Sequence, residues 1–299
     1  MSTHQERNAP ALAGHECSDK VYLVTGGTSG VGRATARGLA RLGARVVLLC
    51  RSEPRGRAAL DAIARETKND RGELVVGDLA SLSSVRAAAA EVRRRFDRLD
   101  GLAHLAGMLS FTPARTPEGL DEMLVVNVLS AFVLTEELRP LLEASRPARV
   151  LTVAGRPSFL RNPRLDFEAL ERALSGLGGL AQTLFAKVGL AFELATRLEG
   201  TGVTSVTFHP GSIKGSTLGR GTAPLWMRVL GRLLFEPFGS EECPIGVHLA
   251  TSPEVASTTG VFFDDRGRVV PFVREAFPRE QTERLWALAA RLSGTRPAG

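Results

Sequence analysis

One glycine-rich segment constrains this chain more than any other: TGGTSGVG at residues 25–32, between a short apolar run and a helix-like stretch. Gly26 allows a tight turn, Gly30 lets a phosphate approach the backbone, and Gly32 allows close packing of the helix, whose free N–H groups attract an anion. The context predicts a loop that holds the pyrophosphate of a dinucleotide, with an ordinary glycine-rich turn as the alternative. The residues expected to contact the cofactor here are Gly26, Thr28, Ser29, Gly30, Val31 and Gly32.

Apolar runs and amphipathic stretches alternate along the rest of the chain. The pattern predicts strands near residues 21–24, 44–49, 74–76, 101–105, 149–153 and 203–208, and helices near 31–42, 55–66, 81–96, 117–144 and 180–198. Such alternation is typical of an α/β fold, a doubly wound parallel sheet of the Rossmann type. We expect one such domain over residues 20–292, with flexible tails at 1–19 and 293–299.

The end of the second expected strand indicates which dinucleotide is bound. It carries Cys50, followed by Arg51, Ser52 and Arg55, where a site that prefers NAD usually offers a carboxylate to the ribose hydroxyls. Guanidinium groups bind a phosphate with charge-assisted hydrogen bonds. The segment therefore favours NADP(H) through the 2′-phosphate, with a solvated basic loop as the alternative.

Composition and charge exclude several other classes of function. The net charge is +6, but the basic residues are spread among acidic ones and aromatic residues are only 6% of the chain, which argues against a nucleic-acid partner. No apolar stretch is long enough for stable membrane insertion, so we expect a cytoplasmic protein. Cys17, Cys50 and Cys243 have neither metal-ligand nor disulfide spacing, so we expect no metal site and no disulfide.

Several separated motifs together resemble the short-chain dehydrogenase/reductase family, and within it the retinol-dehydrogenase-like branch. Besides the glycine-rich turn, they are GDL at residues 77–79, HPG at 209–211, ATSPEV at 250–255 and GVFFDD at 260–265. The resemblance implies that Asp78 contacts the adenine and that the backbone of Ile213 contacts the carboxamide. The further cofactor contacts that it implies are Leu79, Ala106, Gly107, Pro210 and Gly211.

Chemistry in this family uses an Asn, a Ser, a Tyr and a Lys, and two of these positions match. Asn127 corresponds to the helix Asn that supports a water and proton relay, and Lys187 corresponds to the lysine that holds the nicotinamide ribose. A polar helix residue and a surface lysine are the alternative interpretations. Both residues also belong to the predicted cofactor site.

The serine and tyrosine positions do not match. Thr183 stands where the family has its tyrosine, four residues before Lys187, and a threonine hydroxyl is a weak acid near neutral pH. Gly155 stands where the family has its serine; Ser158 is the candidate replacement, with an ordinary loop serine as the alternative. His104 replaces an Asn of the family's N-N-A-G segment, and either titrates near neutral pH or has a structural role.

These features predict an NADP(H)-dependent oxidoreductase with an altered proton relay, acting on an apolar small molecule. Without its acid the site is expected to reduce imines or enones rather than ordinary ketones. A non-redox catalyst, such as a cyclase, isomerase or dehydratase, and a non-catalytic NADP-binding protein are the alternatives. A C-terminal substrate lid is expected at residues 216–241, and the resemblance implies a homodimer or homotetramer through residues 117–144 and 180–198.

Overall fold

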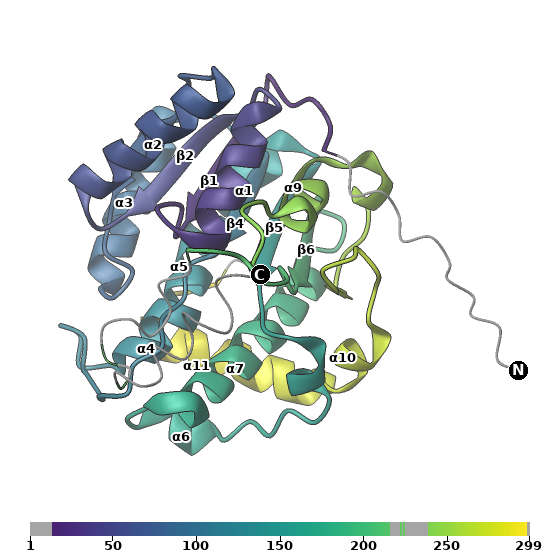
Figure 1. Cartoon of the computed structure of the whole chain (residues 1–299). Coiled ribbons are helices and arrows are strands. Elements are labelled where there is room, and N and C mark those ends of the chain that lie inside the picture. The colour runs from purple at the N-terminus through teal and green to yellow at the C-terminus, as the bar shows by residue number, and fades with distance from the viewer. Residues whose placement is uncertain (1–13, 216–221, 223, 225–238, 298–299) are drawn as a thin grey trace, which may run out of the picture.

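A seven-stranded parallel sheet forms the centre of the computed structural model, which describes residues 14–215, 222, 224 and 239–297 (Figure 1). The strand order is β3-β2-β1-β4-β5-β6-β7, and every neighbouring pair is parallel. The order reverses between β1 and β4, which places the switch point of a doubly wound sheet there. The predicted fold class is confirmed.

The described elements follow the predicted alternation. The strands are β1 (Val21–Thr25), β2 (Arg45–Cys50), β3 (Glu73–Val76), β4 (Gly101–His104), β5 (Ala148–Val153), β6 (Val203–Phe208) and β7 (Phe262–Phe263). The α-helices are α1 (Gly30–Arg41), α2 (Glu53–Thr67), α3 (Leu82–Arg95), α4 (Glu122–Leu124), α5 (Ser130–Ser145), α6 (Phe167–Glu171), α7 (Gly176–Arg197), α9 (Pro244–Thr251), α10 (Pro271–Glu275) and α11 (Arg279–Ser293). A π-helix, Val125–Leu129, joins α4 to α5, and 3₁₀ turns occur at Pro157–Leu160 and Pro253–Val255.

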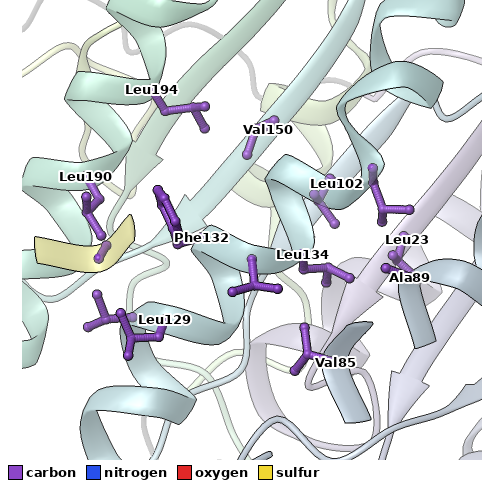
Figure 2. Close-up of a cluster of buried hydrophobic side chains, with 14 of the residues drawn as sticks. Leu23, Val85, Ala89, Leu102, Leu129, Phe132, Leu134, Val150, Leu190 and Leu194 are labelled. Carbon is purple, nitrogen blue, oxygen red and sulfur yellow. The ribbon is translucent and has the colours of Figure 1, made fainter. Parts of the chain in front are cut away.

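Helices cover both faces of the sheet because successive strand residues point to opposite sides. Tyr22 and Val24 pack with α1, α2 and α9, whereas Leu23 packs with α3, α5, α7 and α11. Figure 2 shows the second of these cores, where Leu102 and Val150 of the sheet face side chains of the covering helices. Burial on both faces explains why the strands read as continuous apolar runs.

Three predicted boundaries need correction. The helix expected from residue 117 begins at Glu122, because the preceding residues form a turn in which Thr116 N–H donates to Leu120 O (2.8 Å) and Asp121 caps the helix. The N-terminal tail ends before residue 19, since Cys17 is buried and its N–H donates to Leu42 O (2.9 Å). At the other end, Ser293 is buried, so the chain stays packed beyond the expected start of the C-terminal tail.

Helix α11 lies over the two helices through which an oligomer was predicted. Trp286 packs edge-on against Phe132 of α5, with ring centroids 4.8 Å apart. Leu285 packs against Gly189 of α7, where a Cβ would lie 2.6 Å from Leu285 Cδ1. A contact between subunits through α5 and α7 therefore has to use the surface that α11 leaves uncovered, and the number of subunits stays a prediction.

The predicted substrate lid, residues 216–241, falls almost entirely outside the described residues. Only residues 222, 224 and 239–241 of that segment are described. In the described part of the chain, no helix has the length and apolar character that crossing a bilayer requires.

Candidate active site

A cavity of about 530 Å³ opens at the carboxyl ends of β1 and β4, where the strand order reverses. It extends from the glycine-rich turn and the end of β2 to α7 and the loop after β6. Its lining includes sixteen of the predicted site residues: Gly26, Thr28, Ser29, Gly30, Val31, Arg51, Ser52, Arg55, Ala106, Gly107, Asn127, Thr183, Lys187, Pro210, Gly211 and Ile213. The topology thus brings together residues that are far apart in the sequence.

The glycine-rich turn is packed so closely that side chains would not fit. Gly26 has a φ of +71°, and a Cβ there would lie 2.8 Å from Ala106 Cα on the neighbouring turn. Gly32 does not line the cavity; a Cβ there would lie 2.2 Å from the carbonyl oxygen of Gly26. Helix α1 has no acidic residue in its first turn and no side-chain cap, so its first N–H groups favour an anion.

Two exposed arginines border the cavity at the end of β2. Arg51 and Arg55 form no ion pair with any described residue. The neighbouring carboxylate of Glu53 accepts two hydrogen bonds from Arg57, at 2.6 and 2.9 Å, and so is already paired. This end of the cavity therefore presents unpaired positive charge.

The predicted adenine contacts lie in an adjoining cavity of about 350 Å³. Asp78 and Leu79 line it together with Gly26, Arg51 and Gly107, which also border the larger cavity. The N–H of Ala80 donates to Asp78 Oδ1 (3.0 Å), which fixes the carboxylate at the end of β3. The two cavities together give room for an extended ligand across the switch point.

Lys187 lies on α7 with 8% of its surface exposed. Its ammonium donates to the carbonyl oxygen of Ala106 (3.1 Å), on the turn after β4. No carboxylate lines the cavity among the described residues, so the charge of Lys187 has no counter-ion there. Burial lowers the pKa of Lys187 to about 8.

A hydrogen bond joins Asn127 of the π-helix to Thr183 of α7. Asn127 Nδ2 donates to Thr183 Oγ1 (3.0 Å) and to Met108 O (2.9 Å), while its Oδ1 accepts from Met108 N–H (2.7 Å). The Thr183 hydroxyl itself donates to Leu180 O (3.0 Å), and the residue is fully buried. Its proton is thus committed to a backbone carbonyl and is poorly placed for transfer to a substrate.

The serine position lacks any hydroxyl that faces the cavity. Gly155 lines the cavity at the end of β5, and a Cβ there would lie 2.9 Å from Leu184 Cδ2. Ser158 lies on the following 3₁₀ turn with its side chain exposed, and it is not among the lining residues. The structure therefore does not bring Ser158 to the cavity, because the turn directs its side chain to solvent.

His104 is a buried, neutral side chain rather than a group that titrates near pH 7. Its Nε2 lies 2.8 Å from Thr135 Oγ1, whose own hydroxyl donates to Ala131 O (2.8 Å). Since that proton is committed, we assign the tautomer in which His104 Nε2–H donates and Nδ1 is the acceptor. Burial, helped by the charge of Lys187, lowers the pKa of His104 to about 3.

This low pKa predicts an acid-sensitive fold. Between pH 6.5 and about 3 the unfolded chain binds a proton at His104 that the folded chain does not, so stability falls as the pH is lowered. Between pH 7 and pH 4.5 the free energy of unfolding should therefore fall in the wild type, and in His104→Asn it should fall by about 2–3 kcal/mol less. Urea denaturation at the two pH values measures this. His15→Asn changes an exposed histidine and should behave like wild type; equal losses in all three proteins would contradict the assignment.

Two apolar side chains of the site were not predicted. Leu180 and Leu184 of α7 line the cavity beside Thr183 and Lys187. Their spacing of three and four residues places all four on one helix face, so helical periodicity alone could have found them. They give the α7 end of the cavity an apolar wall.

The remaining predicted contacts lie on the loop after β6. Pro210, Gly211 and Ile213 line the cavity, and Gly211 has a φ of +76°. The loop is held by bonds between Lys214 N–H and Ser240 O and between Ser240 N–H and Ser212 O, both 2.8 Å. Within the described ranges, no group of three or more His, Cys, Asp or Glu side chains is arranged to hold a metal ion.

Comparison with known proteins gives consistent matches. The short chain dehydrogenase family profile matches residues 20–165. Human dehydrogenase/reductase SDR family member 13 is 38% identical over 289 residues, covering 93% of this chain and 74% of that protein, and human retinol dehydrogenase 14 is 33% identical, covering 92% and 86%. A short chain dehydrogenase from Escherichia coli CFT073, solved with NADPH, is 25% identical with a TM-score of 0.64, covering 86% of this chain and 99% of that one.

Proposed function

The chain belongs to the short-chain dehydrogenase/reductase family, and from this premise we propose that it is an oxidoreductase that transfers hydride between NADP(H) and an apolar small molecule. One observation carries the proposal. A single cavity joins the glycine-rich turn and two unpaired arginines at one end to Lys187 and an apolar wall at the other.

The residues of the site fit NADP(H). The turn leaves no room for a Cβ at Gly26 or Gly32, and the first turn of α1 offers N–H groups without an acidic neighbour. Arg51 and Arg55 would hold the 2′-phosphate, and Lys187 would hold the nicotinamide ribose. The similar structure solved with NADPH supports the choice of cofactor.

The apolar wall supports an apolar substrate. Leu180, Leu184 and Val153 line the end of the cavity where the family's catalytic serine and tyrosine would lie. One relative is named for retinol, an apolar alcohol, which is consistent with this wall. The substrate would pack there by the hydrophobic effect, with its reacting carbon toward Lys187.

When bound, NADPH supplies a hydride, and the remaining requirement for carbonyl reduction is a proton on the oxygen. Thr183 is poorly suited to give it because its hydroxyl is bonded to Leu180 O, and Gly155 has no side chain to orient a carbonyl. Losing a positioned acid costs roughly 10²- to 10⁴-fold in rate. An iminium needs no proton and an enone can take one from water, so such substrates are favoured over ordinary ketones.

The same two residues support a second candidate. If the buried Thr183 hydroxyl and the glycine at 155 reflect a loss of redox chemistry, the chain is a non-redox catalyst or a non-catalytic protein that keeps NADP(H) as a scaffold. Titration with NADPH and NADH by fluorescence, followed by NADPH oxidation with ketones, enones and iminium ions, separates the candidates. Turnover of any acceptor supports the oxidoreductase; tight binding without turnover supports the second candidate, and absence of NADPH binding contradicts both.

Arg51→Ala is expected to weaken NADPH roughly 10- to 100-fold, because a charge-assisted bond to the 2′-phosphate is lost. The affinity for NADH should change by less than about threefold, since NADH lacks that phosphate. Parallel fluorescence titrations measure both. Arg65→Ala removes an exposed arginine on the far end of the same α2 helix and should change neither affinity. Equal losses for the two cofactors in Arg51→Ala would exclude a role at the 2′-phosphate.

A further inference from the structure

We propose that Lys187 itself donates the proton to the substrate oxygen when this site reduces a carbonyl, a role that the tyrosine has in the family. The inference rests on the proposed function, since the hydride comes from NADPH. It makes Lys187 the direct proton donor in addition to a residue that holds the ribose.

Elimination among the lining residues leads to Lys187. The Thr183 hydroxyl is fully buried and committed to Leu180 O, and the other aliphatic hydroxyls of the lining are weak acids near neutral pH. Cys50 lies at the opposite end, donates its thiol to Ser52 O (3.3 Å), and burial raises its pKa. The guanidinium groups of the two arginines do not release protons near neutral pH. Among the described lining residues, Lys187 is the remaining proton donor.

The geometry of the ammonium leaves hydrogens for this task. An ammonium has three N–H groups. One is donated to Ala106 O, and no described carboxylate takes another. Two remain for groups that enter the cavity, so one can hold a ribose hydroxyl while the other meets the substrate oxygen. Leu184, three residues before Lys187 on the same helix face, lines the cavity as well and contributes an apolar surface there.

The surroundings of Lys187 keep its proton available. Two small cavities also border Lys187, and the titratable side chain that it shares them with is His104, which is neutral. On the main cavity, the described charged or titratable groups besides Lys187 are Cys50, Arg51 and Arg55. Burial lowers the pKa of Lys187 to about 8, so the group is mostly protonated at pH 7 yet releases its proton readily. The larger of the two small cavities measures about 30 Å³ and is lined by His104, Thr135 and Lys187, so it has room for a water that returns the proton.

The carbonyl carbon gains the hydride and is reduced, while NADPH is oxidised to NADP⁺. The carbonyl oxygen forms an O–H bond as one N–H bond of Lys187 breaks, which leaves a neutral amine. That amine regains a proton from water before the next turnover.

Two substrates of different proton demand test the assignment. The carbonyl probe is 4-nitrobenzaldehyde, and the matched probe is the 2-methyl-3,4-dihydroisoquinolinium ion, which needs hydride but no proton. With NADPH, reduction of the aldehyde should be level below pH 8 and fall about tenfold per pH unit above the pKa of Lys187. Reduction of the iminium ion should show no such fall.

A direct measurement of Lys187 provides a readout that does not depend on activity. The chain has four lysines, so ¹³C-labelled lysine should give four side-chain NMR signals, and Lys187→Arg identifies the one of interest. Its titration, with and without NADPH, should coincide with the fall in aldehyde reduction. Lys187→Arg keeps a cation that cannot release its proton. It should lose aldehyde reduction roughly 100-fold or more, and this loss should exceed the loss of iminium reduction, which reports the role of Lys187 at the ribose, by at least about tenfold. Thermal unfolding confirms that this variant is folded.

The outcomes separate this inference from the proposed function. If NADPH does not bind, or neither probe is reduced, both the proposed function and the role of Lys187 are contradicted. If the iminium ion is reduced but the aldehyde is not, the function stands and Lys187 is not the acid. Lys187 is also excluded as the acid if the aldehyde is reduced with no inflection at the titration of Lys187, or if Lys187→Arg affects both probes equally.

Discussion

Gly32→Ala is expected to weaken NADPH binding by roughly 100-fold or more, about 3 kcal/mol, although it adds a single methyl group. A Cβ at Gly32 would lie 2.2 Å from the carbonyl oxygen of Gly26 and 2.5 Å from its carbonyl carbon. Both are backbone atoms, so no side-chain rotation relieves the overlap. The first turn of α1 has to move away from the glycine-rich turn, and its N–H groups then no longer converge on the pyrophosphate.

Fluorescence titration with NADPH measures the loss, and far-UV circular dichroism establishes that the variant is folded. Gly178→Ala is the matched control. It makes the same chemical change in helix α7, at an exposed position where a Cβ meets no atom within 4 Å. This control should bind NADPH like wild type, and its free energy of unfolding should rise by at most about 1 kcal/mol. A folded Gly32→Ala protein with an affinity within threefold of wild type would show that the turn does not hold the pyrophosphate.

The turn and the sheet were predictable because their signals are local. Strand β1 lies at Val21–Thr25, one residue longer than predicted, since a short apolar run buried on both faces has a recognisable composition. Gly26 and Gly32 were found from the strand-turn-helix context. Their close contacts, with Ala106 Cα and with Gly26 O, give the physical reason why glycine stands there.

The rest depends on contacts between distant segments. The π-helix at Val125–Leu129 adds a residue to one turn, and the apolar pattern around Asn127 does not reveal it. Cys17 was expected in a loose tail, but it is buried and its N–H donates to Leu42 O, a contact that depends on tertiary packing. Ser158 lies close in sequence to the serine position, and only the 3₁₀ turn at Pro157–Leu160 shows that it faces solvent.

The donor pattern around Thr183 was likewise beyond the sequence. The sequence identified a poor acid four residues before Lys187, but not that Asn127 donates to it or that its own proton goes to Leu180 O. These bonds change the interpretation of the altered tetrad. Thr183 is hydrogen-bonded to Asn127 and to Leu180 O, and under our proposal the proton donor is the neighbouring Lys187.

Restoring both missing hydroxyls is expected to create an ordinary carbonyl reductase. The double variant Thr183→Tyr/Gly155→Ser should raise kcat/KM for 4-nitrobenzaldehyde and for simple ketones by up to roughly 10²-fold, the lower end of what a positioned acid contributes, because Lys187 already supplies a proton in the wild type. Position 183 borders the main cavity beside Lys187, so a tyrosine ring there has space to reach a substrate. Either single change should give much less, because the two groups act as a unit on one oxygen.

The structure also indicates what the double variant must overcome. A side chain at 155 meets Leu184 Cδ2 at 2.9 Å, so that leucine has to rotate, and Leu184→Ala makes the room if it does not. Removing the Thr183 hydroxyl leaves one N–H of Asn127 without its partner, at a cost of about 1–3 kcal/mol in stability. Unfolding measurements therefore accompany the kinetics.

Thr183→Phe/Gly155→Ser is the decisive control, since it supplies the same ring and the same serine without the phenolic proton. It should show no gain on carbonyl substrates, while reduction of the 2-methyl-3,4-dihydroisoquinolinium ion should be similar in both double variants. In the tyrosine variant, aldehyde reduction should no longer follow the titration of Lys187, because the phenol has taken over proton transfer. If the phenylalanine variant gained as much as the tyrosine variant, the improvement would come from packing against the apolar wall, and the idea that the missing phenol limits carbonyl reduction would be wrong.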